Sequence, residues 1–555
     1  MEDDPINIDG VTKLDVPEDE LYYMSWSPEK RLNVKAGERV LQQIRDDPGL
    51  VTAQLRDAWT AARVSASDAG SAGQAFAEVV KNMWWAFGVC QQYKDHKLSL
   101  EAWSRMYDAG LPDLVLDIIM ATDFWTLPQS NAVGHLFDIH TRIAWSSQHS
   151  YQPFRQRVLS HSDALWTAMW NNRDIIASWH SDKPPVANLQ EHPSVQALVI
   201  YFVLYRQTET PLAPSSHMPH FSLHAWTTAK CRSMYFDTVY LCDDGVIGPT
   251  LRNPTFIDEA IIDGIGIGPC YARLADLLRG EGPWQWDRPD EVERALNFFD
   301  SLLHVDTPEH RELVVGAGRH RIPHLVATIA KKYALSGGLR TYPRFYNFAF
   351  SIIAKAIQYD LIMRSSSERM ESLVVPGEDL ILILSCSIDV LAVHGNDEST
   401  LDKARPAYDS VKEGLLVCVQ AYYDWALKIK GQPRGTTTAL ERDLLCGLQR
   451  GAQEHWWPSL RALTAAKRRC EGRNKDMAKF GTLWKGFGAL LGCNIKRERD
   501  RDASEAANRC VRIECEYHRK PAEKRLLRCK GCGVFYCSRD CQVAFVFIED
   551  IGYAD

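Results

Sequence analysis

The stretch VERALNFFDSLL, residues Val292–Leu303, places apolar side chains at the spacing of an α-helix. Its apolar positions fall three or four residues apart, which lines one face of a helix with about 3.6 residues per turn. A second stretch with this spacing runs from Ile352 to Leu361. Runs with the period of two that is typical of strands are rare between Leu32 and Cys493. We therefore predict a mostly helical chain.

Two segments share a pattern in which one helix ends and another begins. Tyr107–Val115 and Val315–Val326 each contain a glycine, a short gap, a proline and then an apolar run. Glycine commonly ends a helix, and proline commonly begins one. The pattern is similar to that of armadillo and HEAT-type repeats, in which stacked helices share one core. We expect an irregular α-solenoid, with a compact multi-helix domain as the alternative.

Breaks in the helical pattern are expected where small, polar or proline residues gather, because these residues favour turns. The segments with this composition are Ser65–Gly73, Thr208–His220, Ser365–Ser367, Gly395–Thr400 and Gly431–Thr438.

The composition of the 555 residues, 45% hydrophobic and 24% charged, is that of a globular protein. The acidic start, Met1–Pro5, is unlike the basic start of a signal peptide. The most apolar run, Leu380–Val393, is shorter than the roughly 20 residues that span a bilayer and contains Asp389. We expect a buried helix there, no membrane segment, and an intracellular protein of the nucleus or cytoplasm.

The formal net charge of −7 hides a basic segment. Arg461–Gly533 contains 20 Lys and Arg against 9 Asp and Glu, a net charge of +11. The rest of the chain then carries −18. Such a segment can meet nucleic acid or an acidic partner, but it can also be a solvated helix face.

Six of the 15 cysteines gather near the C-terminus at paired spacings. Two cysteines close in sequence can hold one zinc ion from a tight turn, so this spacing is typical of zinc sites. The six are Cys510, Cys515, Cys529, Cys532, Cys537 and Cys541.

The residues between these cysteines suit a small metal-binding module. The glycines of Cys529–Gly533 permit a tight turn. Val534–Tyr536 is predicted as a short strand, and Ser538 as the N-cap of a short helix that carries Cys541.

The run Cys529–Gln542, with the pattern C-x2-C-x3-Y-C-S-x2-C-Q, resembles the MYND-type zinc finger, a protein-interaction module. The resemblance implies two cross-braced zinc ions and recognition of short proline-containing peptides. Ser538 and Gln542 match positions near the peptide groove. The first zinc would be held by Cys510, Cys515, Cys537 and Cys541, and half of the second site by Cys529 and Cys532.

The chain departs from this pattern after Gln542. The family continues with Asp-Trp, a His and a final Cys, whereas residues 543–555 contain no Trp, His or Cys. Val546 stands near the place of the tryptophan, and Phe545 or Phe547 are its potential replacements. His518 lies in the first loop, which argues against its serving as a ligand. We therefore expect one full zinc site and a doubtful second one.

Other motifs are weaker. The glycines of Gly264–Pro269 lack the spacing and the strand of a dinucleotide loop, and Pro269 fits a helix start. His217, His220 and His224 have spacing that could bring two imidazoles to a metal, but Met218-Pro219 suggests a loop and exposed or hydrogen-bonded histidines. The Asn-His-Ser-Cys motif of the lysine methyltransferases that carry a MYND finger is absent.

The sequence thus predicts a non-enzymatic, zinc-binding scaffold that contacts partner proteins. The alternatives are a nucleic-acid-associated regulator using the basic segment and an enzyme with a site in the helical domain. The expected organisation is an acidic, poorly ordered N-terminus (1–31), an α-helical domain (32–495), a charged helical linker (496–509), an incomplete MYND-like finger (510–544) and an atypical tail (545–555).

Overall fold

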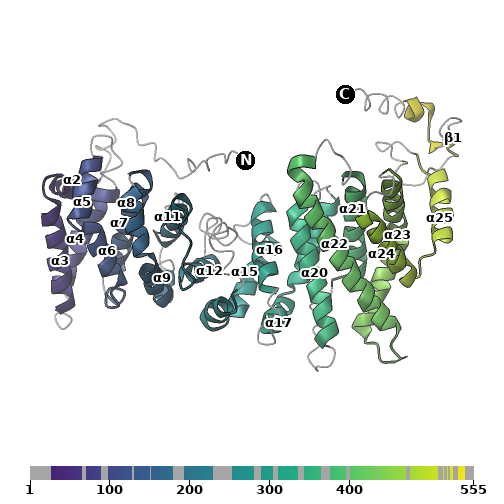
Figure 1. Ribbon diagram of the computed structural model, residues 1–555, viewed down its shortest axis with the longest axis horizontal. Helices are drawn as coiled ribbons and strands as arrows, with labels where there is room; N and C mark the ends of the chain where they lie inside the picture. The colour runs from purple at the N-terminus through teal and green to yellow at the C-terminus, as the bar shows by residue number, and fades with distance from the viewer. Residues whose placement is uncertain are drawn as a thin grey trace. The chain divides into compact units, whose positions relative to one another are not determined.

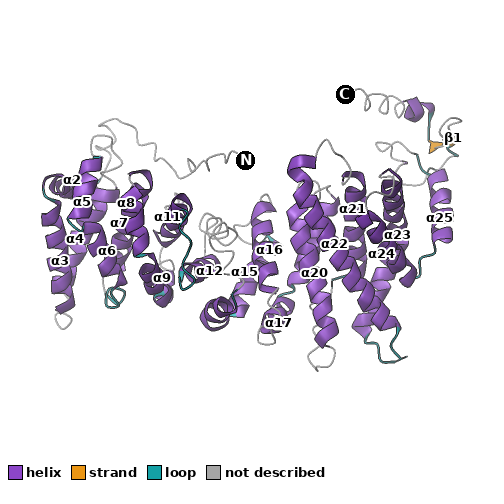
Figure 2. Ribbon diagram, in the orientation of Figure 1, coloured by secondary structure: helices purple, strands orange, loops and turns teal. Residues whose placement is uncertain are grey.

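The structure, a computed structural model, is mostly helical, and Figure 2 shows the small share of strand. It describes residues 27–64, 71–88, 98–127, 130–150, 152–178, 193–228, 253–280, 289–303, 311–335, 343–363, 375–394, 401–433, 435–469, 475–510, 517, 522, 525–528 and 535–543.

The chain divides into two compact units, Met1–Gly266 and Ile267–Asp555. The division falls inside the segment that the sequence predicts as one helical domain. The predicted domain boundaries stay predictions.

The first unit is a two-layer stack of helices. One layer runs α2, α4, α7 and α11, and the other runs α3, α6, α9 and α12, with each helix in contact with the next of its layer (Figure 1). The elements are α2 (Pro28–Asp46), α3 (Pro48–Val64), α4 (Ser71–Gly88), α5 (Leu100–Asp108), α6 (Leu111–Met120), α7 (Ser130–Ser150), α8 (Gln152–Ser160), α9 (Ser162–Asn171), α10 (Arg173–Ser178), α11 (Pro193–Thr208), α12 (Met218–Thr228), α14 (Pro254–Phe256) and the π-helix η5 (Ile257–Ile265).

The second unit repeats this arrangement. Helices α20, α22 and α24 form one layer and α18, α21 and α23 the other, and the layers meet through α18–α20, α21–α22 and α23–α24 contacts. The elements are α15 (Ile267–Arg279), α16 (Pro289–Leu303), α17 (Arg311–Arg319), α18 (Ile322–Leu335), α20 (Pro343–Met363), α21 (Gly377–His394), α22 (Leu401–Lys430), α23 (Ala439–Arg469), α24 (Lys475–Leu490), α25 (Ile495–Ala507), β1 (Leu527–Arg528) and β2 (Phe535–Tyr536).

This arrangement confirms the mostly helical fold and has the character of a helical repeat, because each helix buries its apolar side against neighbours in a continuous stack. Val292, Leu296 and Phe299 are buried on α16, as the periodicity predicts. The apolar run Leu380–Val393 is the buried helix α21. Among the helices that the structure describes, none is long and apolar enough to cross a membrane.

The two predicted helix junctions differ in the role of glycine. At the first, Gly110 lies in the left-handed region (φ 76°) between α5 and α6, as expected. At the second, α17 continues through Gly316 to Arg319, and Arg321 takes the positive φ, so the prediction of a glycine stop is wrong there. A Cβ on Gly316 would lie 2.5 Å from Ile267 Cγ2, which shows that this glycine permits close packing against α15.

The predicted break at Thr208–His220 is confirmed in part. Helix α11 ends at Thr208, but α12 begins at Met218 rather than after His220. The prediction of a loop at Met218-Pro219 is wrong because proline in the first helical turn loses no helical hydrogen bond. By contrast, 431–438 separates α22 from α23 as predicted. Of the other predicted breaks, Ser365–Ser367 and Gly395–Thr400 lie outside the described residues.

Two tryptophans hold α24 to α23. Trp456 Nε1 donates to the Trp484 carbonyl (2.8 Å), and Trp484 Nε1 donates to Ser459 Oγ (3.1 Å). Both indoles are fully buried, and Trp484 shares a face with Phe487 as its spacing predicts. Gly488 lets the Trp456 ring approach, since a Cβ there would lie 2.0 Å from Trp456 Cε2.

We predict that Gly488→Ala lowers the free energy of unfolding by about 1–3 kcal/mol, because the added methyl group overpacks the core against the Trp456 indole. Gly481→Ala on the same helix is the matched control: its Cβ meets no atom within 4 Å, so helix propensity should stabilise the chain by up to about 1 kcal/mol. Urea denaturation of both variants checks this, and equal stability would contradict the packing.

We predict that acid destabilises the first unit through His140. Burial, together with the nearby His161, lowers the pKa of His140 to about 3, and its Nε2 lies 3.0 Å from Tyr201 Oη. The unfolded imidazole binds a proton below about pH 6.5 and the folded one does not, so stability falls as pH drops from about 6.5 toward 3. At pH 5, the protonation of His140 in the unfolded chain lowers the free energy of unfolding by about 2 kcal/mol.

His140→Gln removes that titration. Between pH 7.5 and pH 5, the variant should therefore lose about 2 kcal/mol less than the unmodified chain in urea denaturation. Equal losses in both proteins would show that His140 does not titrate as its burial requires.

Candidate metal centre

The end of α25 is positioned by the helices that precede it. Helix α24 ends at Leu490, where Gly492 takes a left-handed conformation (φ 95°) and turns the chain into α25. Arg461 of α23 and Asp502 of α25 form an ion pair (2.7 Å) that binds the two helices together. The tryptophan-linked helices thus present Cys510 at a defined place.

The chain returns to α25 after Cys510. Cys510 N donates to the Tyr517 carbonyl (2.9 Å), and Ala522 N donates to the Asn508 carbonyl (2.8 Å). These two bonds close the loop at its two ends and bring the Tyr517 side chain onto Cys510.

A short hairpin follows. β1 pairs with β2 in antiparallel register, with Leu527 opposite Tyr536 and Arg528 opposite Phe535. The strand prediction for 534–536 is confirmed for Phe535 and Tyr536. Because the connecting residues 529–534 include Cys529 and Cys532, both cysteines belong to the link between the paired strands.

A helical turn, 539–543, starts after the two residues that follow β2. Cys541 N donates to Ser538 Oγ (3.2 Å), which confirms Ser538 as the predicted N-cap. The turn places Cys541 four residues after Cys537, with the two sulfur atoms 3.4 Å apart.

Three sulfur atoms meet at this point. One Sγ each from Cys510, Cys537 and Cys541 lie within 4.8 Å of one another. Cys510 (1% exposed) and Cys541 (8%) are buried, and Tyr536 (1%) covers them. The cluster joins the end of α25 to the end of the hairpin.

This geometry fits a zinc ion better than a disulfide. A disulfide needs about 2.05 Å between sulfurs, and these three cysteines form none. Two sulfurs at about 2.3 Å from a tetrahedral zinc lie about 3.8 Å apart, close to the Cys537–Cys541 separation. In a four-coordinate site, these three cysteines could supply three of the ligands.

The structure thus brings together three of the six predicted ligands. Cys515, Cys529 and Cys532 lie outside the described residues, as does His518. The peptide-binding role of Ser538 and Gln542 stays a prediction. Both side chains are half-buried, and the Ser538 hydroxyl is engaged in capping.

The basic segment from Arg461 contains internal ion pairs. Besides the Arg461–Asp502 pair, Arg501 lies 2.7 Å from Glu498. Arg499 stacks over Trp457, 6.0 Å from the ring centroid. The Arg501–Glu498 pair lies within α25, whereas Arg461 and Arg499 serve the packing of α25 on α23, which favours a structural role for these arginines over phosphate binding.

The sequence predicts exposed or hydrogen-bonded histidines here, and His217 agrees, since it is half-buried and bonds Thr167 Oγ1 (3.0 Å), whereas the other two are not exposed. His220 and His224 are buried at 5% and 8% exposure. Burial lowers the pKa of each to about 4, aided at His220 by the nearby His217. A ring nitrogen or carboxylate oxygen from each of His217, His220 and Glu259 lies within 4.8 Å of the others. Glu259 gives no signal in the sequence, because it belongs to a distant segment.

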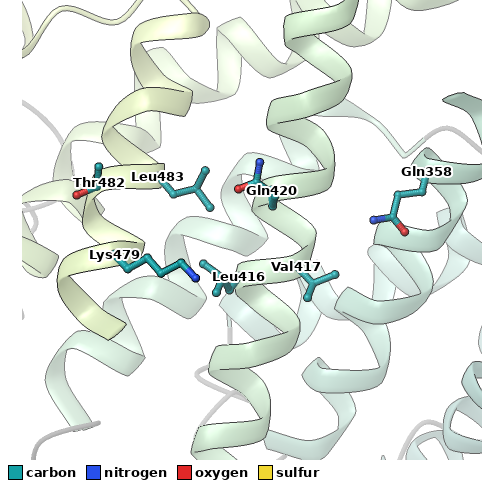
Figure 3. Close-up of a pocket in the computed structure, with 7 residues that line it drawn as sticks. All are labelled: Gln358, Leu416, Val417, Gln420, Lys479, Thr482 and Leu483. Atoms are coloured by element: carbon teal, nitrogen blue, oxygen red, sulfur yellow. The ribbon is translucent and has the colours of Figure 1, made fainter. Parts of the chain in front are cut away.

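A pocket of about 740 Å³ opens in the second unit between α20, α22 and α24 (Figure 3). Of the described residues that line it, only Lys479 carries a titratable side chain, so no set of catalytic groups converges there. The lining residues are Gln358, Leu416, Val417, Gln420, Lys479, Thr482 and Leu483.

The chain matches no protein-family model, and no curated protein matches it. Its function has to be argued from the geometry of its own residues.

Proposed function

We propose that this chain is a zinc-binding scaffold for protein–protein contacts, with a MYND-like finger at its C-terminus that recognises a partner peptide. The observation that supports this most is the buried cluster of Cys510, Cys537 and Cys541. The predicted fourth ligand of this zinc is Cys515.

Zinc would supply the folding energy of the module. The described core around the cluster consists of two buried cysteines, Tyr536 and the partly buried Tyr517 and Cys537. So small an apolar core cannot order a module alone, whereas a structural zinc contributes roughly 10 kcal/mol or more. The hairpin and the last helical turn would therefore fold on the metal.

The surface offered to a peptide would lie beside β2 and the turn 539–543. Ser538 Oγ accepts the Cys541 amide and the Ser538 carbonyl accepts the Gln542 amide, so Ser538 would offer a peptide its hydroxyl hydrogen, and Gln542 would offer its side-chain amide. The helical units, with their stacked layers, would provide the scaffold on which the finger is carried.

We predict that Cys541→Ser lowers the zinc content of the purified full chain by about one equivalent, because a tetrahedral thiolate site does not survive the loss of a ligand. Cys446→Ser is the matched control, since Cys446 is exposed on α23 and outside the cluster. Elemental analysis by mass spectrometry gives the count. Equal zinc in the two variants would refute the finger.

We predict that the zinc-loaded chain binds a member of a library of proline-containing peptides in fluorescence polarisation, and that a chelator abolishes this binding. Gln542→Ala should weaken it at least about tenfold, the effect of losing about 1.4 kcal/mol at a contact. Asp540→Ala, an exposed change on the same turn, is the control.

The salt dependence of binding distinguishes peptide recognition from the alternative function, nucleic-acid binding through the basic segment. Peptide affinity should change little between 50 and 200 mM salt, by analogy with ordinary interfaces, whereas nucleic-acid binding would fall by about 10³-fold or more. Steep salt dependence with DNA or RNA and no peptide binding would overturn the proposal.

A further inference from the structure

A second group of metal-binding side chains lies in the first unit, where α12 and η5 meet. His217 directly precedes α12, His220 lies in its first turn, and Glu259 lies on η5. Pro219 starts the helix early enough to place the two histidines three residues apart on one face. One nitrogen of each ring and a Glu259 carboxylate oxygen lie within 4.8 Å of one another.

His220 is the member of the group whose ring nitrogens lack hydrogen-bond partners among the described residues. It is 95% buried, since its exposure is 5%, and neither of its ring nitrogens makes a hydrogen bond in the described part of the chain. Buried polar atoms without partners are rare, because burial removes their hydrogen bonds to water and no protein hydrogen bond replaces them. The nearest acidic atom, Glu259 Oε2, lies 3.3 Å from His220 Nε2 without hydrogen-bond geometry. A metal ion between them would satisfy both.

The His217 ring has a fixed tautomer. Thr167 Oγ1 donates its single hydrogen to the Asp163 carbonyl (2.8 Å), so it can only accept from His217 Nδ1, 3.0 Å away. His217 therefore carries its proton on Nδ1 and keeps a lone pair on Nε2. Metal-binding histidines are commonly oriented in this way by a partner on the other ring nitrogen.

Aromatic walls hold the His220 ring in place. Trp170 lies 5.3 Å away and Phe256 4.8 Å away, measured between ring centroids, and both meet the imidazole edge to face. Glycine at position 264 leaves room for the Trp170 ring, since a Cβ there would lie 2.8 Å from Trp170 Cη2. Local π-helical geometry, here Ile257–Ile265, is frequent at functional sites. The site is thus built by packing as well as by its ligands.

We propose that His217, His220 and Glu259 bind a divalent transition-metal ion, with zinc the best match. Two histidines and one glutamate are a common zinc ligand set, and three protein ligands leave a coordination position for water. The Glu259 side chain is 54% exposed, so solvent reaches the site from its side. This site is independent of the cysteine cluster, because all of its residues belong to the first unit.

The test is a cobalt titration of the full chain after a chelator has removed all metal and one equivalent of zinc has been returned for the cysteine cluster, followed by absorption and calorimetry. One further equivalent of cobalt should bind with ligand-field bands and without the intense charge-transfer band that thiolates give. If cobalt enters the cysteine cluster instead, that band reports it separately. Failure of the finger and failure of this site are therefore distinguishable.

Three variants make the test specific. Glu259→Gln should abolish this cobalt binding with the circular dichroism spectrum unchanged, since the side chain is largely exposed. Thr167→Val should weaken binding about 10- to 100-fold through loss of the His217 orientation. His220→Ala should abolish it, whereas His224→Ala, which removes a similarly buried imidazole from the same helix, should not.

Two results would overturn the proposal. One is the absence of extra cobalt binding at millimolar metal by the folded chain. The other is cobalt binding that is the same in Glu259→Gln, His220→Ala and the unmodified chain.

Discussion

The C-terminal part of the chain depends on one interaction, the meeting of the Cys510, Cys537 and Cys541 sulfurs. Cys510 comes from the end of a helix that packs on α23, and the other two come from a hairpin and a single helical turn. Few apolar side chains link these pieces. A metal held by the sulfurs, as proposed above, would supply the folding free energy that so small an apolar core lacks.

Each of the two helical units, by contrast, buries many apolar side chains between its stacked layers. Close contacts between helices are made possible by small residues at particular points, such as Gly316 against Ile267 and Gly488 against Trp456. The helices of the second unit position the cysteine cluster: the indoles of Trp456 and Trp484 join α24 to α23, and the Arg461–Asp502 pair joins α25 to α23. The fold therefore delivers Cys510 to its partners.

The sequence predicts the helical class and three of the site residues, because these depend on local periodicity and spacing. Ser538 could be assigned as a cap from its neighbours alone. The roles of Gly316 and Gly488 could not, since they depend on a side chain from another helix. Glu259 could not be joined to His217 and His220 for the same reason: it lies about 40 residues away, on an irregular turn that no period predicts. The start of α12 differs from the prediction because Met218-Pro219 forms a first helical turn, a place where proline is common, as it is in loops.

The most direct measurement is zinc X-ray absorption on the full chain carrying His220→Ala and Glu259→Gln, which leaves the cysteine cluster as the candidate site. A zinc-bound sample whose first shell holds three or four sulfur atoms at about 2.3 Å is expected. A shell of nitrogen and oxygen alone at about 2.0 Å, or a protein without zinc, would contradict it.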